Sequence, residues 1–240
     1  MIVRTLGDSL LLITQPDHAH LAGKVMARAT ALAQHPRRDA ILLAIREHDN
    51  GWAEPDAEPI IGSSGDVADF IAAPVAVRQG VWPRAVQHLA SESWAAALVA
   101  QHAITVYDRF RSDDAWTQFF TDMTALRDRL LGRGALGLDD LVADYAFVRL
   151  GDLISLTFCT GWTTAQHYAE WTVRRDEATV LVTPDPFGGE AVSLDIAGTE
   201  IPRRTYESDR DLREEIGRGR RRHLSGCISH GGAESTEGEG

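Results

Sequence analysis

The sequence is short of the features that mark several common classes of protein. It contains only two cysteines in 240 residues. Cys159 and Cys227 lie far apart in unlike surroundings, so the sequence indicates no disulfide framework. No run of about 18 apolar residues occurs, and the apolar stretch near the N-terminus is too short for a signal peptide. We therefore expect a soluble, cytoplasmic protein.

An excess of positive charge is also missing. The formal net charge is −11, and a field of this sign repels nucleic-acid backbones and anionic membranes. The one basic run, residues 218–222, does not reverse that balance. The glycine-rich segments GRGALG and GSSG lack the lysine and the strand–loop–helix context of a phosphate loop. We expect neither nucleic acid nor a membrane as the main partner.

The composition that remains is that of an ordinary globular protein. With 44% hydrophobic and 25% charged residues, the chain is expected to form one domain over residues 1–216. Its helical core is expected at about 15–175, with β segments at 1–14 and 177–206. Residues 217–240 have almost no apolar content, which predicts a disordered tail.

Hydrophobic periodicity predicts a mainly α fold. Apolar residues recur at helical spacing in several segments, which begin at Pro16 and Asp39 and then cover about 83–90, 94–111, 114–131 and 138–160. The second helix is expected to end at Gly51, where φ can be positive. Short β-branched segments at both ends of the chain predict a small antiparallel sheet that joins the N- and C-terminal segments. The stretch from 51 to 80 is expected to be a long loop.

Polar residues interrupt the apolar face of the second helix. Side chains at i, i+4, i+7, i+8 and i+11 share one face of an α-helix. Counted from Ile41, these positions hold Ile45, His48, Asp49 and Trp52. The adjacent ionisable pair is therefore predicted to point toward the core.

Three other helical segments carry one similar anomaly each. His18 is in line with apolar residues of the first helix, and His102 occupies one position of an apolar stripe in 94–111. Asp152 is flanked at helical spacing by tyrosine, valine, leucine and cysteine. Three histidines and two carboxylates are thus predicted to be buried.

Burial of an unpaired carboxylate costs several kcal/mol unless a cation, strong hydrogen bonds or protonation compensates it. A lone core histidine is more often a hydrogen-bonded structural residue, and an inward aspartate is often paired, here with Arg46 or Arg149. Mixed imidazole and carboxylate ligands are also typical of a divalent metal such as Mn, Fe, Co or Zn, with Mg as a further option. Both interpretations remain open at this point.

The order of these residues resembles a known pattern. His18, the adjacent His48-Asp49 pair and the distant Asp152 resemble the HD-domain superfamily of metal-dependent phosphohydrolases, whose fold is a helical bundle. The segments MIVR, GDSLLLITQPDHAHLAG, AIREHDNGW, ALVAQHA, GDLISLTFC and PDPFGGEAVSLDIAG are similar to an uncharacterised bacterial family of unknown function. The second resemblance covers roughly residues 1 to 206 and names no reaction.

The HD resemblance implies an HD-like bundle with His18, His48, Asp49 and Asp152 as metal ligands. His102 corresponds loosely to the extra histidines by which some members bind a second metal. The implied function is hydrolysis of a small phosphorylated molecule by metal-activated water, with Asp49 and His102 as catalytic residues. This sequence has Asn50 and Gly51 after the His-Asp pair, where many catalytic members carry a lysine nearby.

Two arginines and one histidine complete the set of candidates. Arg46 and Arg78 are candidate contacts for an anionic substrate. A di-iron oxygenase of the same superfamily is an alternative function, and it would require His88 as a sixth ligand. The other alternative is a non-catalytic ligand-binding domain, in which the tryptophans are core and pocket residues.

Overall fold

The protein folds into a layer of helices and one curled sheet. A computed structural model describes residues 1–134 and 136–230. The helices are α1 (Gln15–Met26), α2 (Arg38–Glu47), α3 (Ala53–Ala57), α4 (Val75–His88), α5 (Ser93–Val106), α6 (Asp114–Leu131), α7 (Leu138–Thr160) and α8 (Asp209–Arg218), with short 3-10 turns η1 (Thr30–Leu32), η2 (Asn50–Trp52) and η3 (Asp108–Phe110). The strands are β1 (Ile2–Leu6), β2 (Ser9–Ile13), β3 (Gln166–Tyr168), β4 (Trp171–Asp176), β5 (Thr179–Thr183), β6 (Val192–Pro202) and β7 (Arg220–His230).

The sheet is much larger than the sequence indicated. It has seven strands in the order β1-β2-β6-β7-β5-β4-β3. All neighbouring strands are antiparallel except β5 and β7, which are parallel. The prediction of a mainly α, or all-α, HD-like bundle with a small antiparallel sheet is therefore wrong, and the fold is mixed α/β. Strands β3 and β4 also fall inside the segment 15–175 that was expected to be helical.

The prediction of a disordered tail from residue 217 is wrong for its first part. Strand β7 lies in the middle of the sheet and pairs with β6 over nine positions and with β5 over four. Backbone hydrogen bonds on both edges hold it, although only Ile228 among its described side chains is buried. Most of its other described side chains are polar and exposed, so a low apolar content did not exclude a strand. Residues 231–240 lie outside the described residues.

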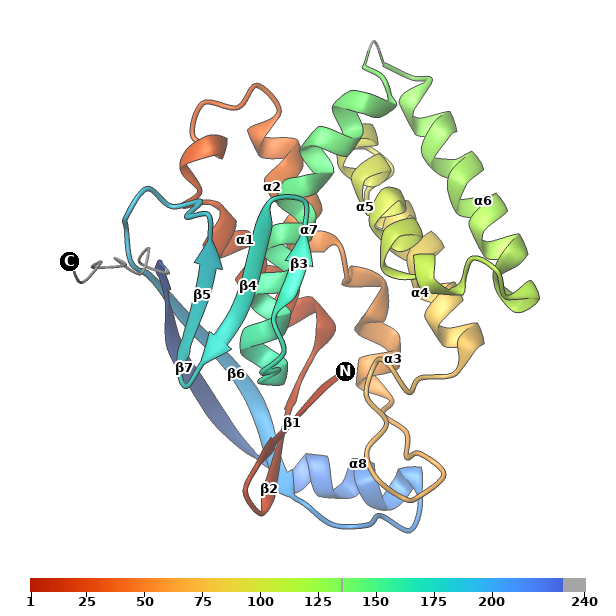
Figure 1. Cartoon of the computed structure of the whole chain (residues 1–240). Helices are drawn as coiled ribbons and strands as arrows, with labels where there is room; N and C mark the ends of the chain where they lie inside the picture. The colour runs from red at the N-terminus through yellow and green to blue at the C-terminus, as the bar shows by residue number, and fades with distance from the viewer. Residues whose placement is uncertain (135, 231–240) are drawn as a thin grey trace, which may run out of the picture.

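Helix α7 connects the helices to the sheet. It packs against α1, α2 and α5 on one side and against β1, β3, β4 and β5 on the other, and Figure 1 shows it between the two layers. Helix α1 approaches it closely at Gly151, where a Cβ would lie 2.8 Å from Cγ of Met26. The absence of a side chain at 151 therefore lets the next residue, Asp152, lie deep between the helices.

Gly51 has a different role from the one predicted. It lies in η2 and is not among the residues with positive φ. A Cβ at this position would instead collide with the backbone oxygen of Val81 in α4. The close contact of η2 with α4 thus requires glycine, and α2 itself ends earlier, at Glu47.

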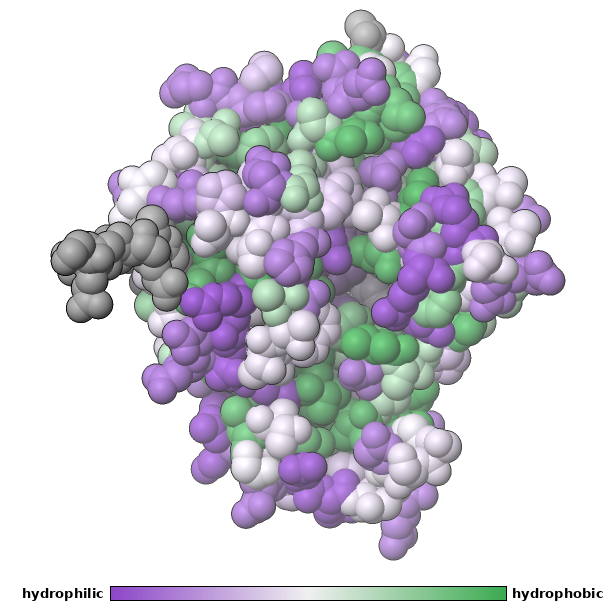
Figure 2. All heavy atoms as spheres, viewed as in Figure 1, coloured by the Kyte–Doolittle hydropathy of each residue, from purple (hydrophilic) through white to green (hydrophobic). Residues whose placement is uncertain are grey.

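The surface is mostly hydrophilic on the face seen in Figure 1. Figure 2 shows hydrophobic residues exposed on this face in a band above the β1–β2 hairpin and α8 and in a second patch near the top of the view. Among the described residues, no helix is both long and apolar enough to cross a membrane.

Candidate metal centre

The predicted polar residues meet at one buried place. His18 lies on α1, His48 caps the C-terminus of α2 and Asp49 follows it, while His102 lies on α5 and Asp152 on α7. Each is at most 5% exposed. We call these five residues the His/Asp cluster. The His48-Asp49 pair lies in the turn just after α2, rather than on the helix as its spacing suggested.

The Nε2 atom of His48 has no hydrogen-bond donor near it. Its Nδ1 donates to the backbone oxygen of Ile45 at 2.7 Å, so the neutral ring carries no proton on Nε2. That Nε2 is buried without a hydrogen-bond partner and lies 3.5 Å from Oδ2 of Asp49 and 3.5 Å from Oδ1 of Asp152. Three acceptor atoms therefore face each other, and only a proton or a cation between them relieves their repulsion.

His18 is oriented in the same way by Ser155. The Ser155 hydroxyl donates to the backbone oxygen of Asp152 at 3.1 Å, so its oxygen accepts from Nδ1 of His18 at 2.9 Å. The other nitrogen, Nε2, then faces Oδ2 of Asp49 at 2.7 Å. A hydrogen bond that fixes the outer nitrogen of a histidine is the usual support of a metal-binding imidazole.

Asp152 divides its two oxygens between different partners. Oδ2 forms an ion pair with the guanidinium of Arg149, one turn earlier on α7. Oδ1 faces His48, and Nε2 of His102 lies 3.8 Å from Oδ2. The Nδ1 atom of His102 is 3.1 Å from the hydroxyl of Tyr145. Arg149 thus neutralises one carboxylate of the cluster and leaves the second without an equivalent partner.

The pKa values reflect this crowding of charge. Burial lowers the pKa of His48, but Asp49 and Asp152 outweigh it and raise the pKa to about 9. Burial lowers the pKa of His102 to about 3, so this ring is neutral. Burial would raise the pKa of Asp152, but Arg149 and the histidines hold it well below its usual value. Without a metal, the positive charge of protonated His48 therefore compensates the charge of Asp49 and Asp152.

The spacing of the ligand atoms suits a metal ion. His18, His48 and Asp49 form one group of three, and His48, His102 and Asp152 form another. Within each group the possible ligand atoms lie within 4.8 Å of one another. Opposite ligands of an ion with bonds of about 2.1 Å are about 4.2 Å apart, so a small contraction would bring the three atoms of either group onto one ion.

A small cavity of about 210 Å³ opens beside the cluster and is lined in part by Asp49, His102 and Asp152. Arg78 also lines this cavity, whereas Arg46 does not and instead pairs with Glu47 at the surface. The structure therefore places only one of the two predicted substrate arginines near the cluster. His88 is exposed at the end of α4 and belongs to neither group of ligand atoms, so a six-ligand array is not formed.

Sequence reasoning missed three residues around the cluster or gave them too small a role. The Ser155 hydroxyl lies 2.9 Å from Nδ1 of His18 and fixes this ring. Tyr145 was interpreted only as part of an apolar stripe, yet it contacts His102. Gln15, the first residue of α1, lines the cavity and was not considered. The spacing from Asp152 could have indicated the first two, because both lie on its face of α7.

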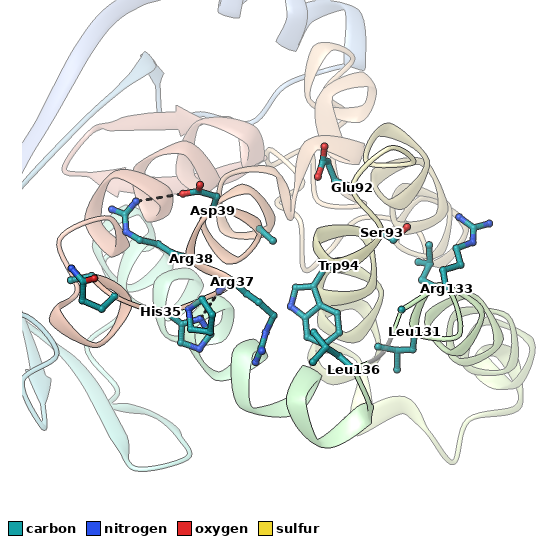
Figure 3. A pocket seen from close by; sticks show the side chains of 16 residues that line it. His35, Arg37, Arg38, Asp39, Glu92, Ser93, Trp94, Leu131, Arg133 and Leu136 are labelled. Carbon is teal, nitrogen blue, oxygen red and sulfur yellow. Dashed lines mark hydrogen bonds and ion pairs between the residues drawn. The ribbon is translucent and has the colours of Figure 1, made fainter.

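A larger cavity of about 730 Å³ lies elsewhere, next to the start of α2 (Figure 3). Its basic residue Arg37 is already bound to Asp144, with Nε at 2.5 Å and Nη2 at 2.9 Å from the carboxylate. Trp94 donates to the same carboxylate at 2.8 Å. Arg37 is therefore already paired, and among the described residues no group of possible metal ligands lines this cavity, so its size does not make it the better candidate site.

Comparison with known proteins places the sequence in a family. A family model described as a protein of unknown function (DUF3891) matches residues 1–203. The chain belongs to the DUF3891 family. No curated protein and no solved structure matches it. The resemblance to an uncharacterised family is thus confirmed, while these comparisons give no support to the resemblance to the HD superfamily. All five residues of the His/Asp cluster lie in the part of the chain that matches the DUF3891 model.

Proposed function

We propose that the His/Asp cluster binds a divalent metal and that the protein is a metal-dependent hydrolase of a small phosphorylated molecule. One observation carries the proposal. Nε2 of His48 lies 3.5 Å from a carboxylate oxygen of Asp49 and 3.5 Å from one of Asp152, and when the ring is neutral these three acceptor atoms have no donor between them. From the HD resemblance, the proposal uses only the order of the ligand residues along the chain. It does not require the HD fold.

The donor set indicates which metals fit. His18, His48, Asp49 and Asp152 would supply two imidazole nitrogens and two carboxylate oxygens, with His102 alongside. Mixed ligands of this kind suit Mn, Fe, Co or Zn, whereas Mg prefers oxygen ligands and retains several waters. With neutral histidines, the two aspartates and Arg149 leave one uncompensated negative charge, which a divalent cation offsets.

Hydrolysis requires a water oxygen to form a bond to phosphorus while the bond to the leaving alcohol breaks and the alcohol takes up a proton. A divalent metal supplies the Lewis acidity that makes water a nucleophile at neutral pH. Nε2 of His18 lies 2.7 Å from Oδ2 of Asp49, and the pKa of Asp49 stays below its usual value because His48 and His18 outweigh the effect of burial. It therefore remains an ionised ligand. His102 is neutral and lines the cavity, so it orients the water or the leaving oxygen.

The test combines metal content with activity. We expect the purified protein to bind Mn, Fe, Co or Zn at about one ion per chain and to release p-nitrophenol from p-nitrophenyl phosphate only with metal. A His48→Ala/Asp49→Ala double variant should lose both properties. Arg46→Gln should keep both, because the Arg46 side chain pairs with Glu47 at the surface and does not line the cavity. A parent protein that takes up none of these metals would end the proposal. Metal uptake without turnover of any phosphoester would leave a metal-binding domain without this activity.

A further inference from the structure

The small cavity limits the size of what can reach the cluster. Its volume of about 210 Å³ is below the range of about 300–1,000 Å³ that is usual for sites of drug-sized ligands. A phosphorylated molecule with a compact body fits a space of this size. A nucleotide, which adds a sugar and a base to its phosphate, exceeds it.

The wall of the cavity is largely aromatic. Phe70, Trp82, Tyr107 and Trp162 all line it. Trp82 lies directly beside the cluster, with its ring centre 5.5 Å from that of His102 and 5.9 Å from that of Tyr107. Val106 and Leu156 add aliphatic surface. A bound molecule would therefore have apolar contacts starting next to the proposed metal ligands.

Two arginines in this wall, Arg78 and Arg109, have no carboxylate partner among the described residues. Of the two, Arg109 is exposed and Arg78 is partly buried. Among the described residues, Arg78 forms no ion pair or hydrogen bond with a carboxylate, and its Nε is buried without a partner. Its guanidinium lies 5.4 Å from the ring centres of both Phe110 and Trp116, which hold it in place. The other deep arginine, Arg149, is already paired with Asp152. Arg78 is thus the more buried of the two cations that are free to bind an anionic group.

The neutral polar groups of the wall are few. Gln15 is only 2% exposed, and its Oε1 is buried without a hydrogen-bond partner in the described part of the chain. Its backbone N–H is held by Asp56 at 2.5 Å, which fixes where the side chain begins. Apart from Asp49 and Asp152, which belong to the His/Asp cluster, no carboxylate among the described residues lines the cavity. Outside the cluster, the wall therefore lacks acidic groups that would bind an ammonium group or the paired hydroxyls of a sugar.

We propose that the substrate is a phosphomonoester of a compact apolar alcohol, similar in size to phenyl phosphate. This proposal rests on the proposed function and specifies its substrate class. The phosphoryl group lies between the His/Asp cluster and Arg78, and the apolar body packs against Trp82 and Trp162. Gln15 forms a hydrogen bond to a hydroxyl or to a water at the phosphoryl end.

The first experiment measures binding without turnover. Phenylphosphonate has a phosphorus–carbon bond that cannot be hydrolysed in this way, so its affinity can be measured by calorimetry with and without Mn²⁺. We expect it to bind at least about tenfold more tightly than inorganic phosphate and than adenosine 5′-phosphate, since its ring buries apolar surface. Adenosine 5′-phosphate that binds as tightly as phenylphosphonate, or phosphate that binds as tightly, would overturn the proposal.

Two variants then test the phosphoryl end and the apolar wall of the cavity separately. Arg78→Gln should weaken phosphate and phenylphosphonate equally, by about tenfold or more. Trp162→Ala should reduce the preference for phenylphosphonate over phosphate and leave phosphate binding unchanged. Arg46→Gln, on the exposed side of α2, is the matched control and should change neither. An Arg78→Gln protein with unchanged affinities, or an unchanged preference in Trp162→Ala, contradicts the proposal. If a variant does not fold, the comparison of phenylphosphonate, phosphate and adenosine 5′-phosphate on the parent protein still tests the proposal.

The failure of this inference differs from the failure of the proposed function. If phenylphosphonate binds with the expected preference but phenyl phosphate is not hydrolysed with any metal, the substrate pocket stands and hydrolysis is wrong. If the protein hydrolyses phosphoesters with metal but prefers adenosine 5′-phosphate to phenyl phosphate, hydrolysis stands and the substrate class is wrong.

Discussion

Helix α7 buries two aspartates in very different surroundings. Asp144 is 1% exposed and accepts three hydrogen bonds, two from Arg37 and one from Trp94. Asp152 lies two turns further along and is 2% exposed. It has one donor group, Arg149, and otherwise faces His48 and the rest of the cluster.

The difference shows that burial next to a histidine is not enough to indicate a metal site. Asp144 also has a histidine nearby, with Nε2 of His35 at 3.4 Å. Its carboxylate oxygens nevertheless already accept hydrogen bonds from protein donors, so a bound cation would add no stabilisation there. At Asp152 and Asp49, acceptors outnumber donors, and this imbalance is what a cation corrects.

The sharpest test of the comparison is the same substitution at both aspartates. Asp152→Asn removes the charge of a proposed ligand, so the affinity for Mn²⁺ or Zn²⁺ should fall by more than about 100-fold, beyond the effect of a residue that only supports a ligand. Asp144→Asn should leave that affinity within a factor of about two. Calorimetric titration of metal into both variants provides the measurement. Equal losses in the two proteins would remove the distinction between the sites.

The second test concerns stability instead of binding. Arg37→Ala leaves the buried Asp144 without its main partner, and the free energy of unfolding should fall by about 3 kcal/mol whether or not metal is present. Arg28→Ala is the control, because Arg28 pairs with Glu190 at side-chain exposures of 57% and 63%, and such pairs contribute less than about 1 kcal/mol. Urea denaturation measures both. A loss as small as that of the control would mean that Asp144 is not held as described.

A smaller effect is expected from the support of His18. Ser155→Ala removes the hydroxyl that fixes the orientation of this imidazole, and metal affinity should fall by about 10–100-fold. Thr157→Ala is a matched control, since this buried hydroxyl of the same helix forms no hydrogen bond in the described structure. It should leave metal affinity unchanged. If both variants bind metal like the parent, Ser155 plays no part in the site.

The smallest effect is a pH dependence of the metal-free protein. In the folded state the pKa of His48 is raised from 6.5 to about 9, by Asp49 and Asp152 against the effect of burial. A raised pKa contributes stability that is complete below about pH 6.5 and is lost as the pH rises through about 9. The urea midpoint should therefore decrease between pH 7 and pH 9.5, and His48→Gln should make that decrease shallower. A urea midpoint that rises over this pH range would show that folding does not raise the pKa of His48.

The sequence was most informative where the helical period was regular. The spacing of apolar residues predicted α6 and α7 at their observed bounds, 114–131 and 138–160. It also predicted that His18, His48, Asp49, His102 and Asp152 are inward, and all are buried. The residues of the candidate site were thus predictable because a polar side chain on an apolar face stands out.

What the sequence did not reveal depends on tertiary contacts. Strand β7 is polar because its outer face is in water, and helix α8 has a low apolar content with only Leu212 buried. Arg46 was a poor candidate for a substrate contact for a reason visible in the pattern, since it lies about 100° away from the stripe of Ile41 and Ile45. The requirement for Gly51 came from the approach of α4, which no local rule predicts.

The position of β7 has a consequence for truncated forms of the chain. The match to the DUF3891 model ends at residue 203, and β7 begins at Arg220. Without that strand the sheet would separate into β1-β2-β6 and β5-β4-β3, divided by a slot about 10 Å wide. The backbone amides and carbonyls of β6 and β5 would then line the slot as open templates for strands of other molecules. A shortened protein designed to the limits of the family match would aggregate.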